Sequence, residues 1–342
     1  HPPFDYYTKE YEKGLQLYSK GVLIMDKCAE LLPDYFSFVK GLVDSEDLSL
    51  NISRETLQHD GQLKLIAKTL EKKIKSELEK MLKDEREAYE EFFKAFGIQL
   101  KFGIYNDYGA HKGTLRDLLI FRSSNEKKYV TLKEYVSRMK EGQDSIYYAC
   151  GETDEKIDML PQTDTVKDKG FEILYLTENV DEFALKMLAE YDGKKFVNIC
   201  DNDLNLDSED EKKALEEENT AAKDMFEAMK ESLGDKINAV RFTNKLKDHP
   251  VCLTSEGGIS LEMEKVLNSM PGAEQNKVKA QLVLEINANH PIAEKLKTLY
   301  TEDKDTLGKY AKLLYGEACL IGGKSVPDPA EHSALVCELM TK

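Results

Sequence analysis

Strand and helix signals alternate along residues 125–200, and this alternation constrains the fold more than any other feature of the chain. Three short segments rich in β-branched and aromatic residues, 145–150, 171–176 and 196–200, are typical of strands. Helical segments separate them, the second spanning 180–191. This order favours a small parallel sheet with right-handed crossovers. Residues 125–200 are therefore expected to form a small α/β unit.

The residues before this unit are expected to form the end of a larger subdomain with a helical layer, over 1–124. Apolar residues recur every three or four positions from 53 to 83, and charged residues fill the other positions. Shorter helices are predicted over 85–96, ending before Gly97, and over 115–121.

Local signals predict three further elements. Residues 14–25 are apolar and are expected to be extended, whereas residues 33–43 are expected to be helical. Thr131 and Glu134 have the spacing of a capping box, which opens a helix that runs to residue 139.

Residues 201–235 break the composition of the chain. They hold 13 acidic residues against 4 lysines, a net −9 out of −16 for the whole chain. The first part, 201–215, is expected to be an acidic linker, and the second an amphipathic helix. Residues 216–342 are then expected to form an α+β domain. Its strands are predicted at 239–242, 251–254 and 280–286, and its last two helices at 305–321 and 329–340.

The bulk properties exclude several classes of function. A net charge of −16 argues against a nucleic-acid-binding protein. No apolar run approaches the length of a membrane span, and no signal peptide is visible. The six cysteines include no CxxC pair, so reduced and mostly buried thiols are expected rather than disulfides or zinc ligands.

Two short motifs imitate ion or phosphate sites but lack the residues that such sites need. The segment 201–212 begins like a calcium loop, but Leu206 and Lys212 occupy the positions of the required Gly and Glu. Gly323-Lys-Ser follows a helix, and Ala318 replaces the first glycine of a phosphate loop. We therefore expect no metal site and no cofactor in this chain.

Arg54 lies in the first turn of the predicted helix that Ser53 caps, and Gln58 follows on the same face. The N–H groups of a helix N-terminus and a guanidinium both favour a phosphate. No glycine-rich cradle accompanies Arg54, so it could complete a phosphate site only if another domain holds the nucleotide. The alternative is a solvated arginine at a helix end.

An apolar stripe with helical spacing lies between two flexible joints, Gly257-Gly258 and Pro271-Gly272. Such joints suggest a helix that can move, and methionines adapt to varied partners. The stripe either offers an exposed apolar surface or packs on its own domain, and its spacing does not decide between these. Its members are Ile259, Met263, Val266, Leu267 and Met270.

The last two predicted helices carry apolar faces that they cannot cover between themselves. Pairing with the same helices of a second copy would give a four-helix bundle on a two-fold axis. The alternative is that both helices fold back on their own domain. The residues expected at the interface are Leu307, Ala311, Leu314, Ala318, Leu335, Val336 and Leu339.

Three long segments resemble one known family. They are GLQLYSKGVLIMDKCAELLPDYFS at 14–37, FVKGLVDSEDLSLNISRETLQ at 38–58 and YVSRMKEGQDSIYYACGE at 135–152. This chain resembles part of the middle domain and the C-terminal dimerisation domain of the ninety-kilodalton heat-shock chaperones, bacterial HtpG type. The resemblance runs from Phe4 to about Met340.

The resemblance implies a cytoplasmic, homodimeric, ATP-dependent chaperone of the stress response. It also implies that the family's N-terminal ATPase domain, which binds ATP and Mg, is missing from this chain and is a partner of it. Arg54, with Gln58 in support, would reach the ATP γ-phosphate held by that domain, so this chain alone should be inactive as an ATPase.

The resemblance further implies that the stripe at Ile259, Met263, Val266 and Leu267 projects into a dimer cleft and contacts unfolded or partly folded client proteins. Phe183 matches a family position that lines the same cleft and often holds Trp. Its alternative role is a core aromatic of the small α/β unit. Two other functions stay open: a dimerisation scaffold that binds no client, and an enzyme built on the small α/β unit.

Overall fold

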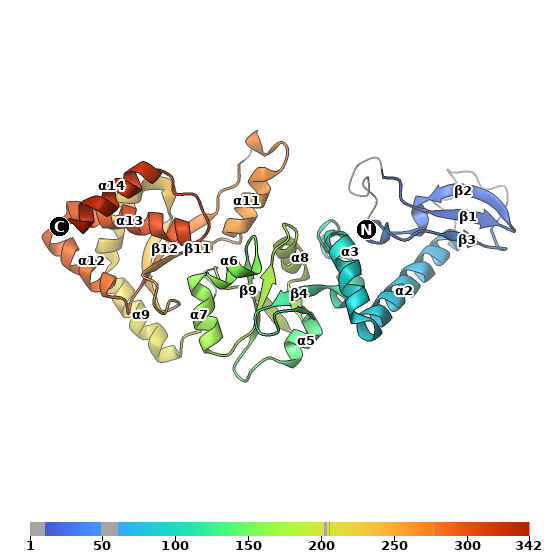
Figure 1. Cartoon of the computed structure of the whole chain (residues 1–342), viewed down its shortest axis with the longest axis horizontal. Helices are drawn as coiled ribbons and strands as arrows, with labels where there is room; N and C mark the ends of the chain where they lie inside the picture. The colour runs from blue at the N-terminus through green and yellow to red at the C-terminus, as the bar shows by residue number, and fades with distance from the viewer. Residues whose placement is uncertain (1–10, 49–60, 202–203, 205, 276, 342) are drawn as a thin grey trace. The chain divides into compact units, whose positions relative to one another are not determined.

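The computed structural model describes residues 11–48, 61–201, 204, 206–275 and 277–341. The chain forms two compact units, and Figure 1 labels the helices and strands for which it has room. Unit 1 takes His1–Phe121, Lys128–Ser137 and Val180–Asp192, and unit 2 takes Arg122–Lys127, Arg138–Asn179 and Gly193–Lys342. The expected class, a mixture of α/β and α+β parts, is confirmed.

Unit 1 opens with a small three-stranded sheet in the order β2-β1-β3. Strands β1 and β2 are an antiparallel pair, which confirms the extended segment at 14–25, and β3 lies parallel to β1. The predicted helix at 33–43 is wrong beyond one 3-10 turn, because Val43 pairs with Leu17 of β1. The elements are β1 Leu15–Ser19, β2 Val22–Cys28, η1 Ala29–Leu31, η2 Asp34–Phe36 and β3 Leu42–Asp44.

Two long helices follow the small sheet in unit 1. Helix α2, Gly61–Asp84, confirms the described part of the helix predicted at 53–83. Helix α3, Arg86–Tyr105, continues through Gly97, so the predicted end at 96 is wrong. A Cβ on Gly103 would lie 2.5 Å from Cβ of Tyr35. The glycine in that last turn thus admits a neighbouring aromatic residue within a continuing helix.

Shorter elements complete unit 1. The helix predicted at 115–121 is only partly present, because Ile120 already begins strand β4. The capping box is confirmed: the Thr131 N–H donates to Glu134 Oε2 at 2.7 Å, and the Glu134 N–H donates to Thr131 Oγ1 at 3.0 Å. The elements are α4 Lys112–Leu115, η3 Arg116–Leu118, β5 Tyr129–Thr131, α5 Leu132–Ser137, α8 Asp181–Leu188 and β8 Glu190–Tyr191.

The first half of unit 2 holds neighbouring strands in the order β4-β7-β6-β9. Strand β6 is parallel to both β7 and β9, which confirms the predicted parallel pairing, whereas β4 is antiparallel to β7. The elements are β4 Ile120–Ser123, β6 Ser145–Cys150, α6 Asp154–Asp158, α7 Pro161–Asp168, β7 Ile173–Leu176 and β9 Lys194–Asn198.

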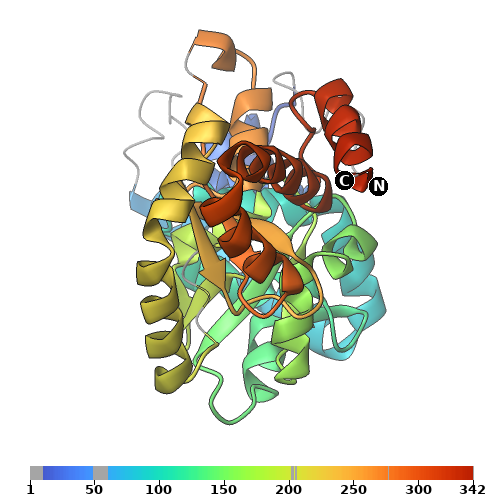
Figure 2. The ribbon, with the colours of Figure 1, turned by 90° about the vertical axis from the view of Figure 1, so that its left-hand side faces the viewer.

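The second half of unit 2 is a three-stranded sheet, β10-β12-β11, covered by helices. All three predicted strands and both predicted terminal helices are present, and α12 is an additional helix that was not predicted. Figure 2 shows α9 and α10 following one another beside this sheet. The elements are α9 Glu209–Ala221, α10 Lys223–Leu233, η4 Gly234–Lys236, β10 Ala239–Thr243, β11 Val251–Glu256, α11 Leu261–Ser269, η5 Ala273–Gln275, β12 Gln281–Asn287, α12 Pro291–Glu302, α13 Lys304–Ile321 and α14 Pro329–Met340.

Helix α9 begins at Glu209, inside the stretch that the composition predicts to be a linker. Ser208 and Glu211 form a complete capping box at its start. This reciprocal cap supports a helix in spite of the acidic sequence. None of its residues is fully buried. The division of the chain into three predicted domains and a linker stays a prediction.

Hydrogen bonds join the two halves of unit 2. The Ser255 N–H donates to the Cys200 carbonyl at 3.3 Å, and the Ser255 hydroxyl donates to Asp201 Oδ1 at 2.6 Å. Gln162 Nε2 donates to the Leu253 carbonyl at 3.4 Å, and the Thr165 hydroxyl to the Lys245 carbonyl at 2.7 Å. The residues after β9 are therefore fixed against β11, and helix α7 is fixed against β11 and the loop that precedes it.

Candidate functional site

Arg54 and Gln58, the predicted phosphate-contacting residues, lie outside the described residues. The same holds for Ser53, the predicted cap of their helix. The role of this segment in nucleotide chemistry therefore stays a prediction.

Helix α11 carries the predicted apolar stripe and is held in place mainly by polar contacts. The Ser260 hydroxyl caps its start by accepting the Met263 N–H at 3.1 Å. Glu264 accepts the Ala280 N–H at 2.8 Å and the Lys324 ammonium at 3.3 Å. Figure 1 shows α11 and the segment after it extending away from the β10-β12-β11 sheet.

The stripe on α11 is only partly covered by its own unit. Val266 is buried at 6% exposure, whereas Met263 and Leu267 are half-buried. Ile259 packs against the core of the second half of unit 2, and Met270 is 45% exposed. Met263, Leu267 and Met270 together keep apolar surface available for a partner.

A surface ion pair also connects α11 to the first half of unit 2. Lys265 Nζ lies 3.1 Å from Glu152 Oε1, and Lys156 also donates to the Glu152 carboxylate. Hydrogen bonds from Lys156 and then Lys265 lower the pKa of Glu152 to about 2. The Glu152 side chain is solvent-exposed, so this pair orients α11 only weakly.

Phe183, on α8 of unit 1, is 6% exposed. Its ring meets the Tyr105 ring edge-on at a centroid distance of 5.4 Å, and the Tyr105 ring lies 6.5 Å from the Phe102 ring. The neighbouring Asp181 forms a buried ion pair with Lys101 at 2.5 Å. Phe183 is thus placed as a nearly buried aromatic, consistent with the core role that its alternative described.

Exposed aromatic residues near Phe183 were missed by the sequence analysis. Phe102 is 38% exposed, Tyr105 is half-buried, and Tyr108 is 88% exposed. Phe102 and Tyr105 stand three residues apart in the last turn of α3, a spacing that marks one helix face, and Tyr108 lies in the turn that follows. A ligand that reached Phe183 would meet Phe102 and Tyr105 as well.

Helix α13 buries its predicted interface residues within the chain. Leu307, Ala311, Leu314 and Ala318 are each at most 5% exposed and belong to the core under the β10-β12-β11 sheet. In this chain they therefore serve folding. Leu320, at the end of α13, is 55% exposed.

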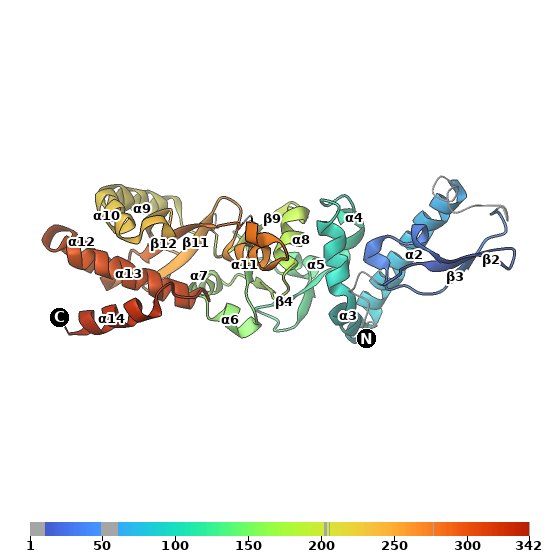
Figure 3. The same ribbon diagram turned by 90° about the horizontal axis from the view of Figure 1, so that it is seen from above.

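Helix α14 lies beside α13, as Figure 3 shows. A Cβ on Gly316 would lie 2.3 Å from Nδ1 of His332, so only glycine permits this approach. Ion pairs of 2.6 Å, Lys309 with Glu338, and 2.7 Å, Lys312 with Glu331, flank the contact.

The predicted interface residues on α14 differ in exposure. Leu335 is 9% exposed, whereas Val336 and Leu339 are half-buried and Met340 is 81% exposed. The start of the helix is confirmed, because the Asp328 side chain accepts the Glu331 N–H at 2.9 Å and Pro329 occupies the first turn. The last three apolar side chains leave a surface on α14 that this chain does not cover.

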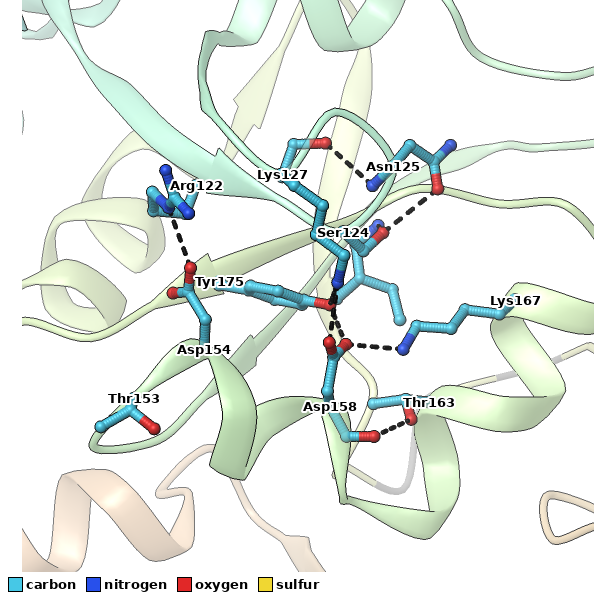
Figure 4. Close-up of polar contacts among 12 residues, drawn as sticks. Arg122, Ser124, Asn125, Lys127, Thr153, Asp154, Asp158, Thr163, Lys167 and Tyr175 are labelled. Carbon is cyan, nitrogen blue, oxygen red and sulfur yellow. Dashed lines mark hydrogen bonds and ion pairs between the residues drawn. The ribbon is translucent and has the colours of Figure 1, made fainter.

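A polar cluster in the first half of unit 2 is the candidate for an enzyme active site on this unit (Figure 4). Asp158 accepts hydrogen bonds from Lys127 at 2.7 Å, from Lys167 at 2.6 Å and from the Tyr175 hydroxyl. Burial raises the pKa of Asp158, but these three hydrogen bonds outweigh it and lower the pKa to about 2.

This cluster has the properties of a structural network. A general base at neutral pH needs a pKa near the working pH, which Asp158 lacks. Burial and the hydrogen bond to Asp158 also raise the pKa of Tyr175 well above its usual range, so the hydroxyl stays protonated. The three donors instead tie α6 to β7, α7 and the turn at Lys127.

No group of three His, Cys, Asp or Glu side chains suited to a metal ion occurs in the part of the chain that the structure describes. Nor does any helix among those residues have the length and hydropathy to cross a membrane.

Comparison with known proteins gives one consistent result. The model of the Hsp90 protein family matches residues 1–342. The chain is 58% identical over 338 residues to the chaperone protein HtpG of Bacillus subtilis and to that of Clostridium perfringens, and 57% identical to that of Alkaliphilus oremlandii. Each match covers 99% of this chain and 54% of the relative, so the chain spans about half the length of the relatives it matches.

Proposed function

The chain belongs to the Hsp90 protein family, and from that premise we propose that it is the client-binding and dimerising part of an ATP-dependent bacterial chaperone. The observation that carries the proposal is 58% identity over 99% of the chain to proteins named chaperone HtpG. The same proposal includes that the protein is soluble and acts in the cytoplasm.

Client binding is assigned to the uncovered stripe on α11, with Phe183 and its aromatic neighbours as a second contact. Met263 and Leu267 are half-buried, and Met270 is exposed, so an unfolded chain can bury apolar surface there. Each contact contributes roughly 1 kcal/mol per buried methylene-sized group, which suits weak and varied clients. Ile259 and Val266 support the helix from the side of its own unit.

Dimerisation is assigned to the apolar surface of α14. Val336 and Leu339 are only half-buried there, Met340 is exposed, and Leu320 on α13 is exposed as well. Pairing of this surface with a second copy would bury all of them on a two-fold axis. The buried positions Leu307, Ala311, Leu314 and Ala318 hold the platform on which α14 lies.

Nucleotide chemistry is assigned to the whole chaperone and only in part to this chain. Arg54 and Gln58 would contact ATP, with Mg, in a separate ATPase domain. This chain alone should then show no turnover. Adding the isolated ATPase domain should restore some hydrolysis, and Arg54→Ala should reduce it.

The decisive experiment measures the affinity for a permanently unfolded, fluorescently labelled protein by anisotropy. Met263→Glu plus Leu267→Glu should weaken binding about tenfold or more, since about 1.4 kcal/mol corresponds to a factor of ten. A control variant, Ala214→Glu plus Thr220→Glu, adds the same charge on the exposed face of α9. It should bind as the unmutated chain does.

The scaffold alternative makes the opposite forecast. If the chain only dimerises, neither variant changes the anisotropy, and the unmutated chain binds no unfolded protein. Equal affinities for the α11 variant and the unmutated chain, with both folded by circular dichroism, would therefore reject client binding at α11.

A further inference from the structure

A small cavity lies where the two halves of unit 2 meet. Gln162 of α7 lines it from the first half, and Leu253 of β11, Leu261 of α11 and Ala318 of α13 line it from the second. The cavity has a volume of about 50 Å³ and is partly open to solvent. One water molecule needs about 10–15 Å³ of such volume, so the cavity has room for about four water-sized groups. It can therefore admit a small organic molecule.

Gln162 brings an unused hydrogen-bond acceptor to this cavity. The residue is 2% exposed, and its Nε2 donates to the Leu253 carbonyl at 3.4 Å. Its Oε1 is buried and has no hydrogen-bond partner among the residues that the structure describes. A buried amide oxygen without a partner is unfavourable. A group that donates to Oε1 from within the cavity would therefore be bound.

The rest of the cavity wall suits carbon atoms better than a cluster of water molecules. Two of its polar side chains already have partners, because the Ser255 hydroxyl donates to Asp201 at 2.6 Å and the Ser260 hydroxyl accepts the Met263 N–H at 3.1 Å. Each buried water needs two to four polar partners. Much of the wall is instead aliphatic and is formed by Leu160, Pro161, Leu253, Leu261, Ala318 and Ile321.

The charge at the cavity favours a neutral ligand. The Glu262 carboxylate lines the cavity, and its side chain is 29% exposed. Together with the net charge of −16, this carboxylate repels anions. A cation held against the aliphatic wall would lose its hydration, which is also unfavourable.

From these contacts we propose that the cavity is a binding site for a small neutral molecule with an N–H or O–H donor and a short aliphatic body, such as a primary amide. The donor meets Gln162 Oε1, and the aliphatic body contacts Leu261 and Ile321. The ligand then touches α7 in the first half and α11 and α13 in the second, so its binding strengthens the contact between the halves. The site does not depend on the proposed chaperone function.

The test compares three probes of similar size in NMR spectra of the full chain labelled at its Leu and Ile methyl groups. Propionamide carries the donor, methyl acetate lacks it, and propionate adds a negative charge. Propionamide should shift the methyl signals of Leu160, Leu261 and Ile321 saturably at millimolar concentration. Methyl acetate should bind roughly threefold or more weakly, because it lacks one hydrogen bond, and propionate should bind more weakly still.

Variants test the assigned contacts. Gln162→Met removes the acceptor at similar size and should lower the affinity for propionamide to that for methyl acetate. Ala318→Val adds methyl groups to the cavity wall and should weaken the binding of both neutral probes. Ala334→Val, at an exposed position of α14, should bind propionamide as the unmutated chain does.

The three probes decide the outcome on the unmutated chain, even if a cavity variant fails to fold. Equal affinities for propionamide and methyl acetate would overturn the proposal. The same conclusion follows if folded Gln162→Met binds propionamide unchanged. If no probe gives saturable shifts at the cavity methyl groups, the cavity holds water only and the proposal is wrong.

Discussion

Asn268 holds the backbone of Val278 through two hydrogen bonds. Its Nδ2 donates to the Val278 carbonyl at 2.8 Å, and the Val278 N–H donates to its Oδ1 at 2.9 Å. Two residues later, the Ala280 N–H donates to Glu264 of the same helix. Side chains of α11 thus fix the backbone at Val278 and Ala280, on the way to β12. Val266 is the only fully buried residue of α11, so these polar contacts supplement a small apolar contact.

Replacing Asn268 with alanine should loosen this return segment. Both hydrogen bonds are lost, and each contributes about 1 kcal/mol. Trypsin should then cut faster at Lys277 and Lys279, and the Val278 amide should exchange faster with deuterium. Asn268→Asp keeps the acceptor for the Val278 N–H and should give an intermediate rate. Identical cleavage rates for all three proteins would contradict the role of the pair.

Removing one partner of the buried pair of Lys101 and Asp181 should strongly lower the free energy of unfolding. Their side chains are 5% and 3% exposed, and the ammonium also lies 5.2 Å from the centre of the Phe93 ring. Lys101→Met removes the ammonium that faces the buried Asp181 carboxylate, at a cost of about 3–5 kcal/mol in urea unfolding.

Two further variants serve as controls for this pair. Lys101→Met combined with Asp181→Leu removes both charges and should regain much of the stability. Lys94→Met removes an exposed lysine of the same helix, paired with Glu91, and should change stability by less than about 1 kcal/mol. If Lys101→Met and Lys94→Met lowered the free energy of unfolding equally, the buried pair would not contribute to stability.

The Asp158 network should make stability depend on acid pH. The folded pKa is about 2, below the ordinary value of 3.8, so the native state favours the ionised carboxylate. Its contribution is therefore complete above about pH 4 and is lost as pH falls toward 2.

Asp158→Asn tests this dependence. The substitution should cost on the order of 1 kcal/mol at neutral pH, because the site is partly exposed. The difference from the unmutated chain should shrink between pH 4 and pH 2 in denaturant titrations. A difference that is constant over this range would show that the charge of Asp158 is not what stabilises the cluster.

The assembly surface on α14 can be tested on one helix. Val336→Glu plus Met340→Glu should convert a dimer into a monomer at micromolar concentration, as measured by sedimentation velocity. With about 3.6 residues per turn, Ala334 and Thr341, the residue that caps the end of α14, lie on another side of this helix. Ala334→Glu plus Thr341→Glu should thus remain dimeric. An unmutated chain that sediments as a monomer would refute the proposed interface.

The spacing of apolar residues predicted the helices and strands that depend on local sequence. It failed where contact with a distant segment of the chain determines the structure. The alternation over 145–200 gave the parallel strands, and helical spacing predicted α2, α13 and α14. Residues 42–44 form a strand only because β1 lies beside them. Helix α3 runs past Gly97 because packing within a long helix outweighs the local preference of one glycine.

The candidate sites show the same limit. An apolar stripe indicates that a helix face is buried. It does not indicate whether the same chain or a partner covers that face. Ala311 and Ala318 of α13 are covered by the chain's own core, while Val336 and Leu339 of α14 remain partly uncovered. Cys150, Cys200 and Cys252 line one cavity because the two halves of unit 2 are in contact, which no spacing in the sequence reveals.

The hydrogen bonds that join the two halves of unit 2 make them energetically interdependent. Gln162 and Thr165, in the first half, supply donors to the carbonyls of Leu253 and Lys245 in the second. Unfolding either half removes these contacts from the other, which raises the free energy of any state with only one half intact. The two halves should therefore melt together in a single cooperative transition. Exchange of one half between relatives should preserve the fold only when the matching donors and acceptors are exchanged with it.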